Sequence, residues 1–100
     1  MELTEEEKGV LMFAARDSIR SIFEEIPKPI INYKFYPHLE ERGAGAFVTL
    51  TIKDNLRGCI GYITSNQTLY ETVCDAAKQA ALNDPRFSPL SQDELRYINI

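Results

Sequence analysis

A short apolar stretch with two glycines, Leu-Arg-Gly-Cys-Ile-Gly at residues 56–61, constrains the fold of this chain more than any other feature. Its apolar side chains favour a β-strand, and the polar residues 53–55 before it predict a tight turn. A glycine inside a strand removes a packing side chain, so it is typical of a bulge or of a place where another backbone or a ligand comes close. We therefore expect the rest of the fold to be organised around this strand.

The segment before the turn predicts the partner of this strand. Apolar and polar side chains alternate at residues 46–52, which is the pattern of a half-buried strand. Joined by the turn at 53–55, the two strands should form an antiparallel hairpin. Residues 97–100 are typical of the start of a further strand, and we expect more sequence or another chain to complete the sheet beyond it.

Three capping boxes, each a Ser or Thr followed three residues later by Glu, predict where helices begin. The first, at Thr4, opens an amphipathic helix whose apolar residues recur at three- and four-residue steps up to Pro27. The second, at Thr68, opens a helix with a face of small residues that can lie close on a sheet, and Pro85 stops it. The third, at Ser91, opens a short helical turn.

The composition disfavours several classes of function. One hundred residues, 44% of them hydrophobic, suit a single domain with its own core. The formal net charge is −4 and the eleven Lys and Arg residues are spread along the chain, which disfavours nucleic-acid binding. No run approaches the roughly 18 apolar residues of a membrane span and the N-terminus is acidic, so we expect a cytoplasmic protein. Two cysteines and one histidine cannot form a four-ligand zinc site, and we expect no metal or cofactor.

Cys59 and Arg57 are the residues of the glycine-containing stretch with the most reactive chemistry. Side chains alternate along a strand, so both should lie on one face, about 7 Å apart. A nearby cation favours the thiolate, which is the nucleophilic form of cysteine. His38 is the only candidate for a general base. The alternatives are that Cys59 only packs, that Arg57 pairs with one of the fifteen acidic residues, and that His38 lies in a surface loop.

Three segments together resemble the AMMECR domain family, which is named for an Alport-syndrome and elliptocytosis chromosomal region. They are the stretch at 56–61, the Phe-Val-Thr-Leu strand at 47–50 and the Asp-Pro-Arg-Phe run at 84–87. The likeness covers nearly all of the chain but about the first half of the family's domain, so residues 1–100 would be the N-terminal part of a single AMMECR-like domain. It implies an α+β fold, with a mixed, partly antiparallel sheet flanked by helices, and an internal duplication of which this chain holds one repeat.

The resemblance implies less about chemistry, because the family has no settled biochemical activity. Its members are sometimes joined to, or encoded beside, a Memo-like protein and a radical S-adenosylmethionine enzyme, which suggests partners of this kind. The family's motif places the functional surface at residues 56–61, with Gly58 and Gly61 as binding residues, and adds a second patch at Arg86 and Phe87.

Three hypotheses follow for residues 56–61. In the first, the chain is an accessory or interaction module that docks a partner protein on this strand, and the aromatic residues at 33–36 add to the surface. In the second, it is an enzyme: Cys59 is a nucleophile or redox thiol, Arg57 binds a small anionic ligand, and Gly58 and Gly61 let the substrate approach the backbone. In the third, Arg57 and the glycines are purely structural. We favour the first hypothesis.

Overall fold

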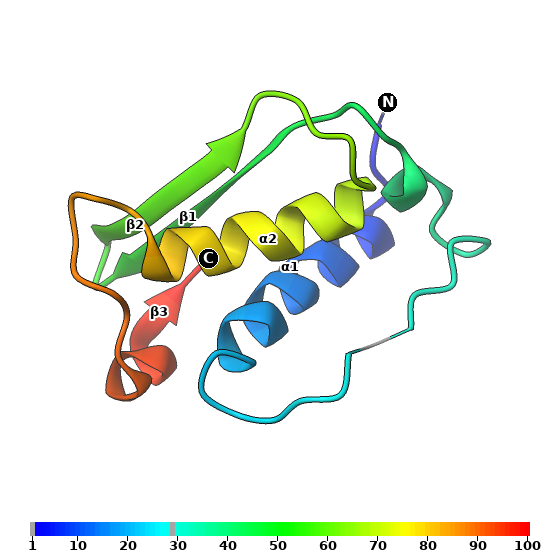
Figure 1. The fold of residues 1–100 in the computed structure, drawn as a ribbon. Coiled ribbons are helices and arrows are strands. Elements are labelled where there is room, and N and C mark those ends of the chain that lie inside the picture. The colour runs from blue at the N-terminus through cyan, green and yellow to red at the C-terminus, as the bar shows by residue number, and fades with distance from the viewer. Residues whose placement is uncertain (1, 29) are drawn as a thin grey trace.

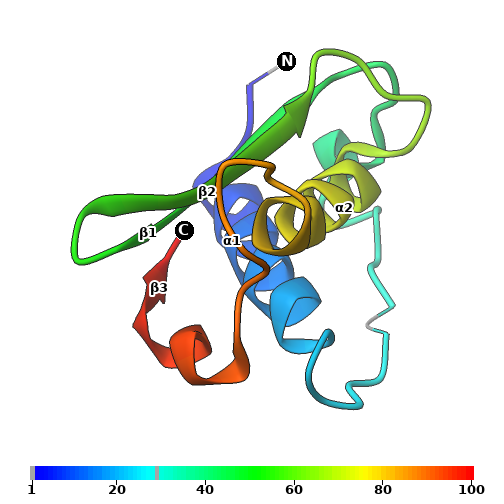
Figure 2. The ribbon, with the colours of Figure 1, turned by 60° about the vertical axis from the view of Figure 1, so that its left-hand side comes forward.

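The computed structural model describes residues 2–28 and 30–100. In chain order its elements are α1 (Glu5–Arg20), the 3₁₀ helix η1 (Pro37–Glu40), β1 (Ala46–Ile52), β2 (Asn55–Tyr62), α2 (Leu69–Leu82), the 3₁₀ helix η2 (Gln92–Tyr97) and β3 (Ile98–Asn99). α2 lies against both strands of the β1–β2 hairpin, and α1 packs along α2 (Figure 1 and Figure 2). The helices therefore cover one face of the sheet, which confirms the predicted α+β class.

The sheet has the strand order β2-β1-β3, and the predicted hairpin forms its main part. β1 and β2 are joined by Lys53 and Asp54, whose φ angles of 50° and 64° are those that a two-residue type I′ turn requires. β3 pairs with the last two residues of β1. Because β1 lies between two strands that both run against it, the described sheet is antiparallel throughout and not mixed as the resemblance implied.

β2 contains the bulge that its glycines predicted. Leu50 pairs with Gly58 and Thr51 pairs with Leu56, which leaves Arg57 as the extra residue on this strand. An extra residue bends the strand locally and changes the direction of its side chain. The alternation of side chains along a strand, from which we expected Arg57 and Cys59 to lie on one face, therefore no longer determines where the Arg57 side chain points.

Gly58 sets how closely α2 approaches the sheet. A Cβ atom on Gly58 would lie 2.2 Å from the carbonyl oxygen of Ala80, a distance that real side chains do not adopt. The backbone whose close approach the sequence predicted is therefore that of α2. The buried apolar residues of the core include Leu11, Ile19, Leu39, Val48, Leu50, Ala76, Ala77, Ala80 and Ile98.

α1 ends at Arg20 and not before Pro27, so the predicted end of this helix was wrong. Beyond it, the backbone N–H groups of Ile22 and Phe23 donate to carbonyl oxygens three residues back instead of four, which tightens the chain into turns. The hydroxyl of Ser21 donates to another carbonyl oxygen of the last helical turn and competes with the helical pattern. The apolar period continues in the sequence because Ile22 and Phe23 still pack against the core from this turn.

Candidate functional site

The bulge in β2 places Arg57 against Glu94 of η2. Nε of Arg57 donates to Oε2 of Glu94 at 2.7 Å and Nη2 donates to Oε1 at 2.9 Å, and the Arg57 side chain is 13% exposed. Hydrogen bonds from Arg57, together with one from the backbone N–H of Ser91, lower the pKa of Glu94 to about 2. Hydrogen bonding to Glu94 raises the pKa of Arg57 in turn. Arg57 thus has the carboxylate partner that the sequence predicted for a partly buried arginine.

Asp84 joins the loop after α2 to the middle of β2. Its buried carboxylate accepts a hydrogen bond from the backbone N–H of Cys59 at 3.0 Å. It also accepts hydrogen bonds from Nε and Nη2 of Arg86, at 3.0 and 2.7 Å, and from the Arg86 backbone N–H. The hydrogen bonds from Arg86 hold the pKa of Asp84 well below its usual range, against the opposing effect of burial.

Phe87 is in contact with both arginines. The guanidinium carbon of Arg57 is 5.9 Å from the centre of the Phe87 ring and that of Arg86 is 5.5 Å from it, within the range of cation–π contacts. The strand patch and the Arg86–Phe87 patch, which the sequence predicted separately, therefore meet in one site. We call Arg57, Asp84, Arg86, Phe87 and Glu94 the arginine cluster.

Sequence reasoning missed two members of this cluster, Asp84 and Glu94. Asp84 was noted only as part of the Asp-Pro-Arg-Phe run at 84–87, and Glu94 as part of a capping box, a role that it also has. Asp84 also binds Arg86, two residues along the chain, but the Cys59 backbone and Arg57, which Asp84 and Glu94 bind on β2, lie 25 and 37 residues away, so no local pattern joins the two carboxylates to this strand. The one available signal was general: a partly buried arginine needs a carboxylate.

The side of the hairpin that faces away from the helices is open. Residues paired in an antiparallel sheet share a face, and the pairs here are Phe47 with Gly61, Thr49 with Cys59 and Thr51 with Leu56. We call these six residues the outer sheet face. Its two large apolar side chains are markedly exposed, Phe47 at 66% and Leu56 at 41%.

The two glycines predicted to bind a ligand have different surroundings. Gly58 is buried under Ala80, so α2 already occupies the space beside it. A Cβ atom on Gly61 would lie 2.4 Å from the ring of Phe47, which shows that this ring covers the glycine. The Phe47 ring and the Ala46 carbonyl oxygen therefore fill the space beside Gly61, and a ligand could reach the space beside Gly58 only if α2 moves.

Cys59 is half-buried on the outer sheet face. Its sulfur lies 3.3 Å from the hydroxyl oxygen of Thr49, and its backbone is held by Asp84. The guanidinium of Arg57, which we expected to favour the thiolate, is directed to Glu94. The structure therefore positions the thiol firmly but pairs the neighbouring cation with a carboxylate.

His38, the candidate base, is bound to the start of α1. Its Nδ1 lies 2.7 Å from Oε1 of the fully buried Glu7, and its backbone N–H donates to Oε2. Burial acts to raise the pKa of Glu7, but hydrogen bonds from Thr4 and His38 outweigh it and lower the pKa to about 2. No hydrogen bond joins His38 to Cys59 in the part of the chain that the structure describes, so the geometry gives His38 a structural partner.

The aromatic residues 33–36 do not join the outer sheet face. The hydroxyl of Tyr33 is hydrogen-bonded to that of Thr68 at the start of α2, at 3.2 Å. Phe35 is 74% exposed and meets Tyr36 edge to face, with ring centres 6.5 Å apart.

Two further observations concern residues 2–28 and 30–100 only. No three of their His, Cys, Asp or Glu side chains lie close enough together to hold a metal ion. No helix formed by these residues is both long and apolar enough to cross a bilayer.

Comparison with known proteins finds relatives that match most of the length of this chain. A model of the AMMECR1 family matches residues 12–100. A protein of Sulfolobus acidocaldarius is 47% identical over 94 residues, which cover 90% of this chain and 40% of that protein. A protein of Methanosarcina acetivorans is 39% identical over 95 residues, which cover 93% of this chain and 48% of the relative. The chain thus spans less than half the length of these curated relatives.

A solved structure has the same fold. The crystal structure of the uncharacterized protein PH0010 from Pyrococcus horikoshii superimposes with a TM-score of 0.83 at 29% sequence identity. The match covers 98% of this chain and 50% of that protein. The α+β arrangement described above is therefore also that of half of an experimentally determined structure.

Proposed function

The chain belongs to the AMMECR1 family, and we propose that it is an accessory or interaction module that docks a partner protein on its outer sheet face. The observation that supports this most is the exposure of Phe47 and Leu56 on the face of the hairpin that is turned away from the helices. A large apolar side chain contributes roughly 1.5–3 kcal/mol when it is fully removed from water. Aromatic side chains are enriched at the centres of protein interfaces, where a few of them supply much of the binding energy.

The arginine cluster supports a docking role over an anion-binding role. Arg57 and Arg86 each donate two side-chain hydrogen bonds to a carboxylate of the same chain. An anionic ligand bound by these same donors would have to displace Glu94 or Asp84, and displacing either would leave a charged group without its partner. The cluster instead fixes the strand on which the outer sheet face is built, because Asp84 holds the backbone of Cys59.

The resemblance to the AMMECR domain family names the proteins to test as partners. A Memo-like protein and a radical S-adenosylmethionine enzyme, each purified, should be titrated onto the immobilised chain. We expect one of them to bind, and Phe47→Thr to weaken that binding by at least about tenfold. Threonine is β-branched and is favoured in strands, so the fold should be preserved.

Phe35→Thr is the matched control, because Phe35 is as exposed as Phe47 but lies outside the outer sheet face. Equal loss of binding in both variants would contradict the proposed surface. If neither protein binds the unaltered chain, this choice of partners is wrong.

The alternative function is an enzyme that uses Cys59 as a nucleophile or redox thiol. The observation in its favour is the fixed position of the thiol, with the Thr49 hydroxyl 3.3 Å from the sulfur and the Cys59 backbone held by Asp84. Cys59→Ser distinguishes the two functions. Unchanged partner binding supports the module, whereas loss of an activity with an intact fold supports the enzyme.

A further inference from the structure

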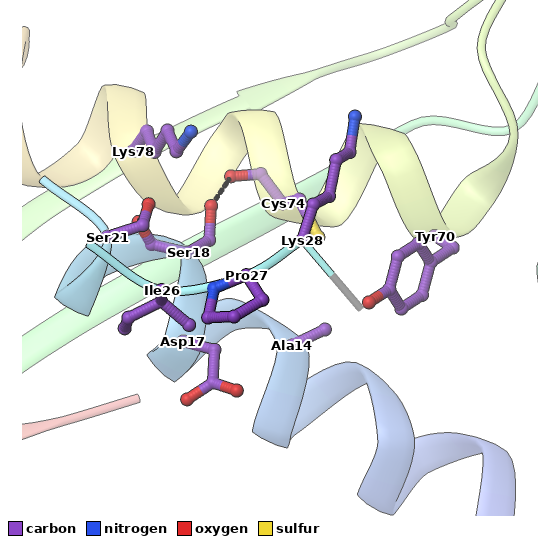
Figure 3. A pocket seen from close by; sticks show the side chains of 10 residues that line it. All are labelled: Ala14, Asp17, Ser18, Ser21, Ile26, Pro27, Lys28, Tyr70, Cys74 and Lys78. Carbon is purple, nitrogen blue, oxygen red and sulfur yellow. Dashed lines mark hydrogen bonds between the residues drawn. The ribbon is translucent and has the colours of Figure 1, made fainter. Parts of the chain in front are cut away.

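The outward side of α1 carries apolar side chains that belong neither to the core nor to the outer sheet face. The inward side of this helix packs on α2, where the hydroxyl of Ser18 donates to the Cys74 carbonyl oxygen at 2.7 Å beside the pocket drawn in Figure 3. On the opposite side, Met12 is 49% exposed and Phe13 is 69% exposed. The solvent side of a helix normally carries polar residues, so two large apolar neighbours there indicate an interaction surface.

A hollow on this side of α1 has the geometry of a helix-packing site. The α1 residues that line it are Gly9, Met12, Phe13 and Arg16, and the end of the chain at Asn99 and Ile100 closes one side. Four helical residues with this spacing form the hole that receives one side chain of a second helix. Gly9 keeps its part of the hollow open, because a Cβ atom there would have no neighbour within 4 Å. The volume is about 370 Å³, and pockets of roughly 300–1,000 Å³ hold drug-sized molecules, so an aromatic side chain fits.

The charges along this side of α1 differ in sign between its two ends. Glu5 and Glu6 lie in the first turn, whereas Arg16 and Arg20 lie in the C-terminal half. Nη2 of Arg16 donates to the Ile98 carbonyl oxygen at 2.9 Å, but no carboxylate pairs with this arginine among the residues that the structure describes. Glu5 and Arg20 form ion pairs at the surface, where such pairs contribute at most about 1 kcal/mol. These charges can therefore pair with another molecule at little cost.

This pattern is complementary to itself when two copies of α1 run antiparallel. If Met12 of one copy lies against Phe13 of the other, Glu5 of each copy faces Arg20 of the other. A two-fold axis repeats every contact, as in most homodimers. A parallel pair would instead place Glu5 beside Glu5 and Arg20 beside Arg20, and like charges repel each other.

We propose that the outward side of α1 pairs with the same side of α1 in a second copy of this chain, antiparallel and with two-fold symmetry. Phe13 of each copy enters the hollow beside Gly9 and Met12 of the other copy. One pair of helices is smaller than a standard protein interface, so the dimer should be weak, with a Kd of about 0.1 mM. The surface shares no residue with the outer sheet face, so the dimer does not depend on the proposed docking function.

Sedimentation equilibrium of the purified chain tests this proposal. Between about 10 µM and 1 mM, the average mass should rise from that of the monomer towards that of the dimer. Phe13→Gln should weaken the association by at least about tenfold, and its fold should be preserved because the ring is exposed. A chain that stays monomeric up to about 1 mM would overturn the proposal and leave this side of α1 to a different partner.

Two control variants remove an exposed ring elsewhere. Phe35 and Phe47 are 74% and 66% exposed, close to the value for Phe13, and both lie outside α1. Phe35→Gln and Phe47→Thr should therefore leave the association unchanged. If either control weakens it as much as Phe13→Gln does, the proposed surface is wrong.

An exchange of charges tests the antiparallel arrangement. Glu5→Arg places two cations opposite each other at both ends of the helix pair, and Arg20→Glu places two carboxylates there. Each variant alone should associate several-fold more weakly than the unaltered chain. An equimolar mixture should recover the original affinity, because a mixed dimer pairs a cation with a carboxylate at both ends, and recovery also shows that both variants are folded. If the mixture associates no better than the separate variants, the proposed arrangement is wrong.

Discussion

The arginine cluster and the outer sheet face both include residues of the strand at 56–61, yet they are opposite in character. In the cluster, Arg57 and Arg86 are each held by a carboxylate, and both contact the Phe87 ring. On the outer sheet face, Phe47 and Leu56 are exposed. The charged groups of the cluster are paired within the chain, whereas the outer sheet face offers apolar surface.

This difference separates residues that stabilise the fold from residues that can contact a partner. A charged residue in a sequence motif is easily taken for a ligand-binding group, but Arg57 is already bound to Glu94. The exposed residue of the same motif is the apolar Leu56, and Cys59 is half-buried on the same face. The motif therefore combines structural positions with surface positions on a single strand.

The largest expected effect comes from closing the space at Gly58. Gly58→Ala would place a Cβ atom 2.2 Å from the Ala80 carbonyl oxygen and force α2 away from the sheet. We expect the free energy of unfolding to fall by about 3 kcal/mol, measured by urea denaturation.

Gly9→Ala is the matched control, because the Cβ position of this α1 residue has no atom within 4 Å. It should stabilise the protein by roughly 0.5–1 kcal/mol through the better helix propensity of alanine. Equal responses of the two variants would contradict the structural role of Gly58.

The next largest effect is a loss of stability at acid pH, which comes from the Arg57–Glu94 pair of the arginine cluster. The pKa of Glu94 is about 2 in the folded chain against 4.5 for an ordinary glutamate, so its ionised form stabilises the fold. That contribution is complete above pH 4.5 and is lost as the pH falls toward 2. The urea midpoint of the wild type should therefore fall with pH in this window, and more steeply than that of Glu94→Gln. Parallel pH profiles of the two proteins would show that the Arg57–Glu94 pair adds nothing to stability.

A smaller effect is expected when the geometry of Arg57 changes but its charge does not. Arg57→Lys loses the planar pair of hydrogen bonds to Glu94 and should lower the free energy of unfolding by about 1 kcal/mol. Arg96→Lys, at an exposed arginine over the Tyr97 ring, should change it by less than about 0.5 kcal/mol. If Arg57→Lys reduced partner binding while leaving stability intact, the distinction between an arginine cluster that stabilises the fold and an outer sheet face that binds a partner would be wrong.

The smallest expected effect on stability is on the open side of the hairpin. Phe47→Thr removes an exposed ring and should change the free energy of unfolding by less than about 1 kcal/mol, although we expect it to reduce partner binding strongly. Thermal unfolding followed by circular dichroism is sufficient to measure this. A loss of several kcal/mol would mean that the Phe47 ring, which covers Gly61, belongs to the core.

Local patterns were enough to predict much of the fold. The alternation of apolar and polar side chains at residues 46–52 and the turn after them predicted the hairpin. The capping box at Thr68 predicted the start of α2. The end of α1 could not be read in this way, because the apolar period continues through Ile22 and Phe23 while the hydrogen bonds change to a tighter pattern. The internal duplication that the resemblance implies stays a prediction.

The candidate site was predictable only in part. Sequence reasoning found Arg57, Cys59 and the Arg86–Phe87 patch, since these residues belong to recognisable motifs. These residues are brought together by Asp84, which binds the Cys59 backbone 25 residues away, and by Glu94, which binds Arg57 37 residues away. Contacts over such separations are set by how α2 and η2 pack on the sheet, and no spacing along the sequence encodes them.

The most direct test of the open outer sheet face is maleimide labelling of Cys59 in the folded protein, followed by mass spectrometry. A Cys74→Ser background leaves Cys59 as the only thiol. We predict that Cys59 is labelled without denaturant, that Phe47→Thr does not slow the labelling, and that a bound partner protein protects it. If Cys59 reacts only after unfolding, the outer sheet face is closed in solution and the proposed docking surface is wrong.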